Sequence, residues 1–323
     1  MLGSQKLGLV TAGGDAPGMN ATIRSVVRTA IFNELEVLGI EKGYLGLLKN
    51  EFCRLDARTV SGIIHLGGTI LKTSRCKEIR TPEGIEKASE TLKALNIDCL
   101  VVIGGDGSLH GAMKLQEASG IPVVGIPATI DNDVPGTEET VGFDTAVNTA
   151  LIEIDKIRDT ATSHERLFIV EVMGHHSGFI ALEVGVGAGA ELILVPEVEY
   201  TFDIVCEHLE RARKSGKTSS IIVMAEGAGD SHALVKQLSG LGSYETRLSV
   251  LGYAQRGGAP SARSRILASL FGVAAVDLFL EGKKKTLVGL EKGQIITSTL
   301  DVVSKGSKQL DSQLLKIANI LSQ

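Results

Sequence analysis

Short apolar runs rich in β-branched residues alternate along the chain with longer stretches of helical pattern. We expect five of these runs to be buried strands: residues 6–12 (KLGLVTA), 99–105 (CLVVIGG), 121–127 (IPVVGIP), 167–174 (LFIVEVMG) and 220–227 (SIIVMAEG). Strands that alternate with helices are typical of βαβ units, in which the sheet is mostly parallel. The pattern therefore predicts an α/β fold.

The order of these elements predicts two domains, the first of them discontinuous. A chain of 323 residues exceeds the usual size of one compact core. Residues 251–282 have the pattern of a turn followed by a long helix, which we expect to return to the first sheet. We predict a larger domain of residues 1–138 plus 251–305 and a smaller domain of residues 139–250 plus 306–323.

Composition and charge exclude several classes of protein. The net charge of −5 argues against a general nucleic-acid partner, which requires a basic domain or stripe. The four cysteines (Cys53, Cys76, Cys99 and Cys206) are scattered without metal-type spacing, so we expect reduced thiols. The N-terminus offers no secretory apolar region, and no apolar run reaches membrane-spanning length. We expect a cytoplasmic protein with no membrane partner.

Two glycine-rich turns follow predicted strands. Gly13, Gly14 and Gly18 leave room for an anion in the first turn, and we expect Asn20 to cap the helix that follows. The second turn, residues 104–108 (GGDGS), places Asp106 where it can bind Mg²⁺. Strand ends converge on one crevice in open α/β sheets, so the two turns predict a polyphosphate site. The alternative is that these glycines serve only tight turns.

A third element is GIPATIDNDVPGT, residues 125–137, in which Asp131 and Asp133 follow a strand end. Residues two apart in an extended segment share one face, so we expect both acids to enter the crevice. Phosphoryl transfer needs a metal at the donor phosphates and a carboxylate that accepts the proton of the attacking hydroxyl. We predict that Asp131 is this base. The alternative is an Asx-rich turn between Pro127 and Pro135.

Six motifs occur in the order in which bacterial ATP-dependent 6-phosphofructokinases carry them. They are GGDAPGMNA (13–21), GGTIL followed by TSR (67–75), GGDGS (104–108), TIDND (129–133), VEVMG (170–174) and QRGGAPSA (255–262). The chain resembles this family over nearly its whole length. The resemblance implies a phosphofructokinase fold of two Rossmann-like three-layer domains, the larger binding nucleotide and the smaller sugar phosphate. It also implies a glycolytic, allosteric homotetramer that transfers the γ-phosphoryl group of Mg-ATP to the 1-hydroxyl of fructose 6-phosphate.

The resemblance also assigns residues to the phosphoryl-transfer site. Asp131 matches the proton acceptor, Arg75 the group that bridges the transferred phosphoryl, and Asp106 the Mg²⁺ ligand. Arg80 is expected to support nucleotide binding. The implied catalytic set is Gly14, Arg75, Thr129 and Asp131. The implied nucleotide-binding set is Gly14, Arg75, Cys76, Gly105, Asp106, Gly107 and Ser108.

For the sugar phosphate, the family's Arg166 and Arg247 counterparts reach into a neighbouring subunit's site. The full implied set is Thr129, Ile130, Asp131, Arg166, Met173, Gly174, His175, Glu226, Arg247, Tyr253, Ala254, Gln255 and Arg256. His175 and Tyr253 depart from the family's usual Arg and His, which alters charge. Cys76 replaces an aromatic residue of some relatives, and Lys72 stands where glycine is common.

The resemblance further implies an effector pocket for a nucleoside diphosphate or phosphoenolpyruvate. The implied positions are Arg24, Arg28, Arg158, Gly189, Glu191 and Lys217. The pocket departs from the family pattern, because Ala57 occupies the place of an effector-binding Arg and Gly62 that of an acid. Ser215 and Ser219 also replace basic residues. We therefore expect a weak or altered effector response.

Other functions stay open as alternatives. A pyrophosphate-dependent relative typically has Asp after the GGD triplet and Lys before TIDND, whereas this chain has Gly107 and Ala128. A second alternative is a noncatalytic regulatory paralogue that binds nucleotide. Kinases of NAD or lipids also carry GGDG, but they lack the TIDND and QRGG motifs.

Overall fold

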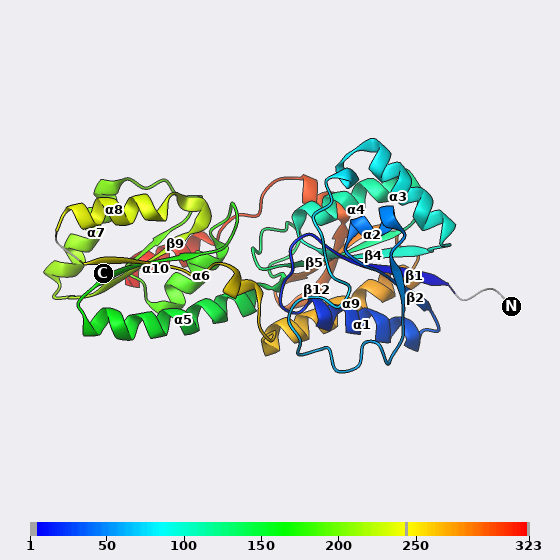
Figure 1. Ribbon diagram of the computed structural model, residues 1–323, viewed down its shortest axis with the longest axis horizontal. Coiled ribbons are helices and arrows are strands. Elements are labelled where there is room, and N and C mark those ends of the chain that lie inside the picture. Colours follow the sequence, from blue (N-terminus) through cyan, green and yellow to red (C-terminus); the bar gives the residue numbers. More distant parts are fainter. Residues whose placement is uncertain (1–4, 243–244, 322–323) are drawn as a thin grey trace. The chain divides into compact units, whose positions relative to one another are not determined.

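The computed structural model describes residues 5–242 and 245–321. It divides into two compact units, coloured by sequence in Figure 1. The first unit comprises Met1–Asp144 and Arg256–Lys308, and the second comprises Thr145–Gln255 and Gln309–Gln323. The domain boundaries expected from the sequence, at 138, 251 and 305, precede these unit boundaries by a few residues.

The first unit is built on one sheet in the order β12-β11-β5-β4-β1-β2-β3, with β6 added beside β5. Its strands are β1 (Lys6–Ala12), β2 (Glu36–Ile40), β3 (Phe52–Leu55), β4 (Cys99–Gly104), β5 (Val123–Thr129), β6 (Val141–Gly142), β11 (Lys285–Glu291) and β12 (Gln294–Thr299). The sheet is parallel except at β3 and β12, which pair antiparallel at its two edges. Antiparallel edge strands on a parallel sheet are common in doubly wound folds.

Helices cover both faces of this sheet, which makes the first unit a three-layer structure. Figure 1 shows α1 and α9 on one face and α2, α3 and α4 on the other. The helices are α1 (Met19–Phe32), α2 (Tyr44–Lys49), α3 (Pro82–Ala94), α4 (Asp106–Ser119) and α9 (Ala262–Leu280), with short 3₁₀ turns η1 (Glu78–Arg80) and η4 (Leu300–Ser304). Because helices cover both faces, β1, β4 and β5 are buried along almost their whole length.

The second unit has a four-stranded parallel sheet in the order β10-β7-β9-β8. Its strands are β7 (Leu167–Val172), β8 (Leu192–Leu194), β9 (Ser220–Ala225) and β10 (Thr246–Val250). Its helices are α6 (Phe179–Ala188), α7 (Phe202–Lys214), α8 (Ser231–Gly240), α10 (Ser312–Leu321) and most of α5 (Phe143–Ser163), with the 3₁₀ turn η2 (Glu226–Ala228). The 3₁₀ turn η3 (Gly252–Arg256) ends with the first residue of the next segment of the first unit. Ile169 and Ile222 form a core with Val205 of α7 and Leu234 of α8. The predicted α/β fold with mostly parallel sheets is confirmed.

The predicted cap of α1 is wrong. Gly18, at φ 106°, is the N-cap residue, and Asn20 lies inside the first turn. The Asn20 amide instead holds a neighbouring loop, because it donates to the carbonyl oxygens of Leu66 and Gly67 and accepts the N–H of Ile70. A residue caps a helix only from the position before its first turn, and the left-handed Gly18 begins the helix two residues too early for Asn20.

No helix among the described residues combines the length and the apolar content that crossing a bilayer requires.

Candidate active site

The two glycine turns of the first unit lie in direct contact. β1 and β4 are parallel neighbours in which Ala12 pairs with Gly104, so both turns begin at the same edge of the sheet. A Cβ atom on Gly13 would lie 2.6 Å from the hydroxyl oxygen of Ser108, and Gly13 has φ 88°. A Cβ atom on Gly104 would lie 2.7 Å from Cβ of Ser108. Only glycine allows the two turns to approach this closely.

The second turn leads into the N-terminus of α4. Asp106 is the first helical residue, and the N-cap Gly105 supplies no side chain to the free N–H groups. The first N–H groups of a helix have no partner inside the helix, which makes this end suited to anions. The Asp106 side chain is 43% exposed, and its Oδ1 lies 3.3 Å from Nδ1 of His110. Gly107 is exposed, and no atom lies within 4 Å of the place of its Cβ.

The segment that contains Arg75 is tied to the end of β1. The Thr73 hydroxyl donates to the carbonyl oxygen of Gly13 over 2.8 Å, and the Thr11 hydroxyl donates to that of Lys72 over 3.0 Å. Lys72 has φ 59°, a left-handed conformation that glycine adopts more readily than lysine. The Arg75 side chain is exposed, and burial raises the pKa of the neighbouring Cys76 thiol.

The third predicted element follows β5, beside the second glycine turn. β4 and β5 are parallel neighbours, and a Cβ atom on Gly105 would lie 3.2 Å from Cβ of Thr129. The Thr129 hydroxyl accepts the N–H of Asp131 over 3.2 Å and donates to Oδ2 of the same residue over 3.3 Å. Asp131 is half-buried. The ends of three neighbouring strands therefore bring Gly13, Asp106 and Asp131 to one edge of the sheet.

The expectation that Asp131 and Asp133 share a face of an extended segment is wrong. Asn132, between them, has φ 54°, so the backbone turns into the left-handed region there. The buried Asn132 side chain accepts the N–H of Thr140 and donates to the carbonyl oxygen of Glu138. The Asn132 side chain thus stabilises the turn, and the Asp131 carboxylate is not used for this purpose.

The second unit gathers a separate group of predicted residues. Met173 donates its N–H to the buried Gln255 side chain over 2.9 Å, and His175 donates its N–H to Glu226 over 2.8 Å. His175 has φ 55°, and its ring centroid lies 3.9 Å from that of His176. Tyr253 is 77% exposed. Two hydrogen bonds within the second unit therefore join four of the predicted sugar-phosphate residues in pairs, Met173 with Gln255 and His175 with Glu226.

Arg166 and Arg247, also in the second unit, meet at a residue that the sequence did not single out. Oε1 of Glu245 accepts a hydrogen bond from Nη2 of Arg166 over 2.9 Å and pairs with Nη2 of Arg247. The Arg166 guanidinium, together with Arg247, holds the pKa of Glu245 below its ordinary value. Glu245 lies directly before β10 and two residues before Arg247, and this spacing is the signal in the sequence from which the acid could have been identified.

Arg256 lies in the first unit, beside the first glycine turn. A Cβ atom on Gly14 would lie 2.9 Å from Nη1 of Arg256, and the same nitrogen lies 3.9 Å from Oδ1 of Asp15. The predicted residues Gly14 and Arg256 are thus brought together.

The predicted effector residues make local contacts within each unit. Arg24 and Arg28 lie one turn apart on α1 of the first unit. In the second unit, Arg158 donates to the carbonyl oxygen of Gly189 over 3.3 Å. Glu191 accepts from Lys217 over 3.3 Å and from the N–H of Ile221 over 2.7 Å. The acid and the lysine of the predicted pocket are thus already paired.

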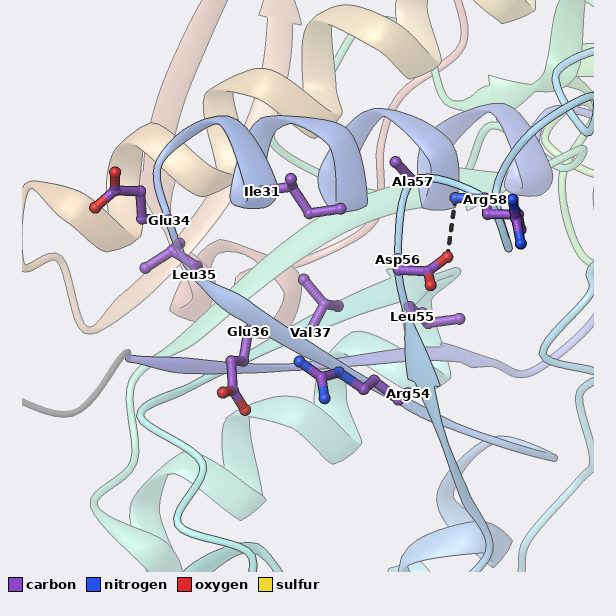
Figure 2. Close-up of a pocket in the computed structure, with 10 residues that line it drawn as sticks. All are labelled: Ile31, Glu34, Leu35, Glu36, Val37, Arg54, Leu55, Asp56, Ala57 and Arg58. Carbon is purple, nitrogen blue, oxygen red and sulfur yellow. Dashed lines mark hydrogen bonds between the residues drawn. The ribbon is translucent and has the colours of Figure 1, made fainter.

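A cavity of about 530 Å³ lies near the C-terminal end of α1. Figure 2 shows its lining, which includes Ala57 and Arg58, with the Arg58 N–H donating to Oδ1 of Asp56. Ile31, Leu35, Val37 and Leu55 supply its apolar part. Arg24 and Arg28 are not among its lining residues. The cavity also contains none of the residues predicted for phosphoryl transfer.

Comparison with known proteins adds an independent line of argument. The model of the phosphofructokinase family matches residues 6–279. The chain is 52% identical over 316 residues to the ATP-dependent 6-phosphofructokinase of Clostridioides difficile, covering 98% of this chain and 99% of that one. It is 50% identical over 319 residues to the ATP-dependent 6-phosphofructokinase of Bacillus pumilus, again covering 98% and 99%.

Solved structures share the fold. The phosphofructokinase of Saccharomyces cerevisiae superposes with a TM-score of 0.88 at 34% identity over 98% of this chain, which spans about half of that longer chain (47%). A pyrophosphate-dependent phosphofructokinase from Marinobacter aquaeolei superposes with a TM-score of 0.85 at 25% identity, covering 96% of this chain and 86% of the other. The family match, the relatives and the fold agree with the six ordered motifs, and the chain belongs to the phosphofructokinase family.

Proposed function

We propose that this chain is a cytoplasmic, glycolytic ATP-dependent 6-phosphofructokinase that phosphorylates the 1-hydroxyl of fructose 6-phosphate to give fructose 1,6-bisphosphate and ADP. The observation that carries the proposal is the convergence of the two glycine turns and Asp131 at adjacent strand ends. The relatives that share about 50% sequence identity with this chain over nearly its full length are ATP-dependent 6-phosphofructokinases. The role of each residue below is part of the proposal.

The curated relatives are ATP-dependent, and kinases of this kind generally need a divalent metal; we propose Mg²⁺ held through Asp106. No cluster of three or more acid, His or Cys side chains among the described residues is arranged to hold a metal ion. The residues fit Mg²⁺ nonetheless, because this ion is usually bound by one or two carboxylates together with substrate phosphates and water. When bound, it neutralises charge on the donor phosphates.

The chain's own groups supply the remaining steps. Asp131, held by the Thr129 hydroxyl, accepts the proton of the 1-hydroxyl as that oxygen bonds to the γ-phosphorus. The bond from the γ-phosphorus to the bridging oxygen breaks, and ADP leaves with that oxygen. Gly14 and the N-terminus of α4 bind the phosphates through N–H groups. Arg75 stabilises negative charge on the transferred group, for which a planar and permanently charged guanidinium is suited.

The sugar phosphate is assigned its own set of residues in this proposal. Arg166 and Arg247 bind the 6-phosphate. Glu226 accepts a hydrogen bond from a sugar hydroxyl, and the hydrogen bond that it accepts from the N–H of His175 fixes its position. The remaining proposed contacts are Ile130, Met173, Gly174, His175, Tyr253, Ala254, Gln255 and Arg256. His175 and Tyr253 reduce the positive charge relative to the family pattern, so substrate affinity depends more strongly on the two arginines.

A substrate panel tests the proposal. Fructose 6-phosphate, tagatose 6-phosphate and other acceptors are each offered ATP and pyrophosphate with Mg²⁺, and product formation is measured. We expect the highest kcat/KM for fructose 6-phosphate with ATP. A preference for pyrophosphate would overturn the donor assignment and make Lys72 the first residue to re-examine. Nucleotide binding without turnover would favour the regulatory paralogue.

The active species is expected to be a homotetramer. The proposed roles of Arg166 and Arg247 place them at a neighbouring subunit's sugar phosphate, which requires association. Sedimentation velocity or light scattering under assay conditions measures the assembly. A fully active monomer would remove the shared-site hypothesis and leave the chemistry of Asp131 untouched.

Weak or altered allosteric control is a further expected result. Glu191 already neutralises Lys217, and Ala57 supplies no charge where the family pattern has an Arg. An effector shifts an equilibrium only by its differential affinity for two states, and fewer charge-assisted contacts leave less difference. Saturation curves for fructose 6-phosphate with and without ADP and phosphoenolpyruvate measure the response. Strong shifts that Arg24→Ala and Arg28→Ala abolish would show a fully working pocket.

A further inference from the structure

Glu245, Arg166 and Arg247 are brought to one place by the register of two strands. β7 and β10 pair in parallel with Leu167 opposite Thr246, and the N–H of Leu167 donates to the carbonyl oxygen of Glu245. Arg166 and Glu245 therefore face each other one residue before the paired positions. Arg247, two residues after Glu245, shares its side of the strand. The pairing of the two strands thus brings the three side chains into contact beside the first residues of β7 and β10.

A single carboxylate oxygen holds both guanidinium groups. Oε1 of Glu245 accepts from Nη2 of Arg166 over 2.9 Å and pairs with Nη2 of Arg247. Without an anion between them, two cations at this separation repel each other. The Glu245 side chain is 46% exposed and the Arg247 side chain 50% exposed, so an incoming anion can reach the pair. The carboxylate occupies the point at which a phosphate would receive hydrogen bonds from both arginines.

We propose that Glu245 is a competing anion: it holds Arg166 and Arg247 together, and the 6-phosphate of the sugar displaces it, so Glu245 lowers the affinity for substrate. This inference rests on the proposed function, in which the two arginines bind the sugar phosphate. The phosphate carries close to two negative charges and can take two hydrogen bonds from each planar guanidinium, whereas the carboxylate takes one from each. A sugar without a phosphate does not displace the carboxylate. Glu245 thereby favours phosphorylated over unphosphorylated sugars.

The test removes the charge and keeps the shape. Glu245→Gln is expected to lower KM for fructose 6-phosphate by about three- to tenfold, the range of one or two exposed ion pairs, with kcat and KM for ATP unchanged. Glu245→Asp keeps the negative charge and is expected to stay closer to the wild type. Glu210→Gln removes the same charge from an exposed position on α7 and serves as the matched control. A merely structural role does not lower KM, because damage to a site weakens binding.

If KM for fructose 6-phosphate is unchanged or higher in Glu245→Gln, the inference is overturned. The melting temperature of the variant shows whether it is folded, so that a misfolded variant is recognised. The arginine variants distinguish its failure from that of the proposed function. If Arg166→Ala and Arg247→Ala leave KM for fructose 6-phosphate unchanged, the assigned sugar-phosphate site fails and the inference with it. If they raise KM while Glu245→Gln has no effect, the inference alone fails. In the Arg166→Ala, Arg247→Ala background, Glu245→Gln is expected to lose its effect.

Discussion

Asp131→Ser is expected to lower kcat by about 10²–10⁴, with a much smaller change in the KM values for fructose 6-phosphate and ATP. Serine cannot accept a proton near neutral pH, so the attacking hydroxyl loses its base. The backbone N–H of residue 131 still donates to the Thr129 hydroxyl in the variant, since this contact does not use the carboxylate. Steady-state kinetics with each substrate varied in turn measure the effect.

Asp98→Ser makes the same chemical change outside the site. Asp98 precedes β4 and accepts the N–H of Lys6, at the end of the strands opposite to Asp131. We expect its kcat to match the wild type, which separates the loss of a base from any general effect of replacing Asp by Ser. If Asp131→Ser keeps most of its turnover while both variants are folded by circular dichroism, Asp131 is not the base.

Five strands of the fold were predicted from the sequence, whereas the internal strands β2 and β11 and the edge strands were not. β1, β4, β7 and β9 fall within their predicted runs, and β5 overlaps its run at residues 123–127, because strands covered by helices on both faces read as continuous apolar sequence. β12 has only half-buried and exposed positions, and β10 has a single buried residue, Thr246. An edge strand of this kind has no clear apolar pattern of its own. Its position depends on the strand to which it is hydrogen-bonded; for β10 this is β7, which lies far away in the sequence.

The site was predictable where it depends on strand order and was missed where it depends on local backbone. The contact between the two glycine turns follows from β1 and β4 being parallel neighbours. The cap expected at Asn20 and the shared face expected of Asp131 and Asp133 rested on general preferences. Both expectations failed for a backbone reason: Gly18 has φ 106° and Asn132 has φ 54°. Asn is among the residues that tolerate the left-handed region, so the turn at Asn132 had a signal in the sequence. Glu245 required the register of β7 and β10.

Gly107→Asp is expected to lower kcat/KM for ATP by about 10²-fold. The position lies in the first turn of α4, where the free N–H groups are proposed to bind the nucleotide phosphates. A carboxylate about 5 Å from a phosphate charge, at an effective dielectric constant of about 20, costs about 3 kcal/mol, which corresponds to about two orders of magnitude in binding. The measurement is kcat/KM for ATP at saturating fructose 6-phosphate, with pyrophosphate tested in parallel.

The fold is expected to tolerate this substitution, which makes the result specific. No atom lies within 4 Å of the place of the Gly107 Cβ, and Gly107 is not among the glycines with positive φ. An acid in the first turn of a helix interacts favourably with the helix dipole, so the melting temperature of Gly107→Asp is expected to equal or exceed that of the wild type. Gly107→Ala adds a methyl group without charge and is expected to keep most of its ATP-dependent activity. Because the two variants differ in a carboxylate, equal activity with ATP in both would mean that no nucleotide phosphate lies at the N-terminus of α4.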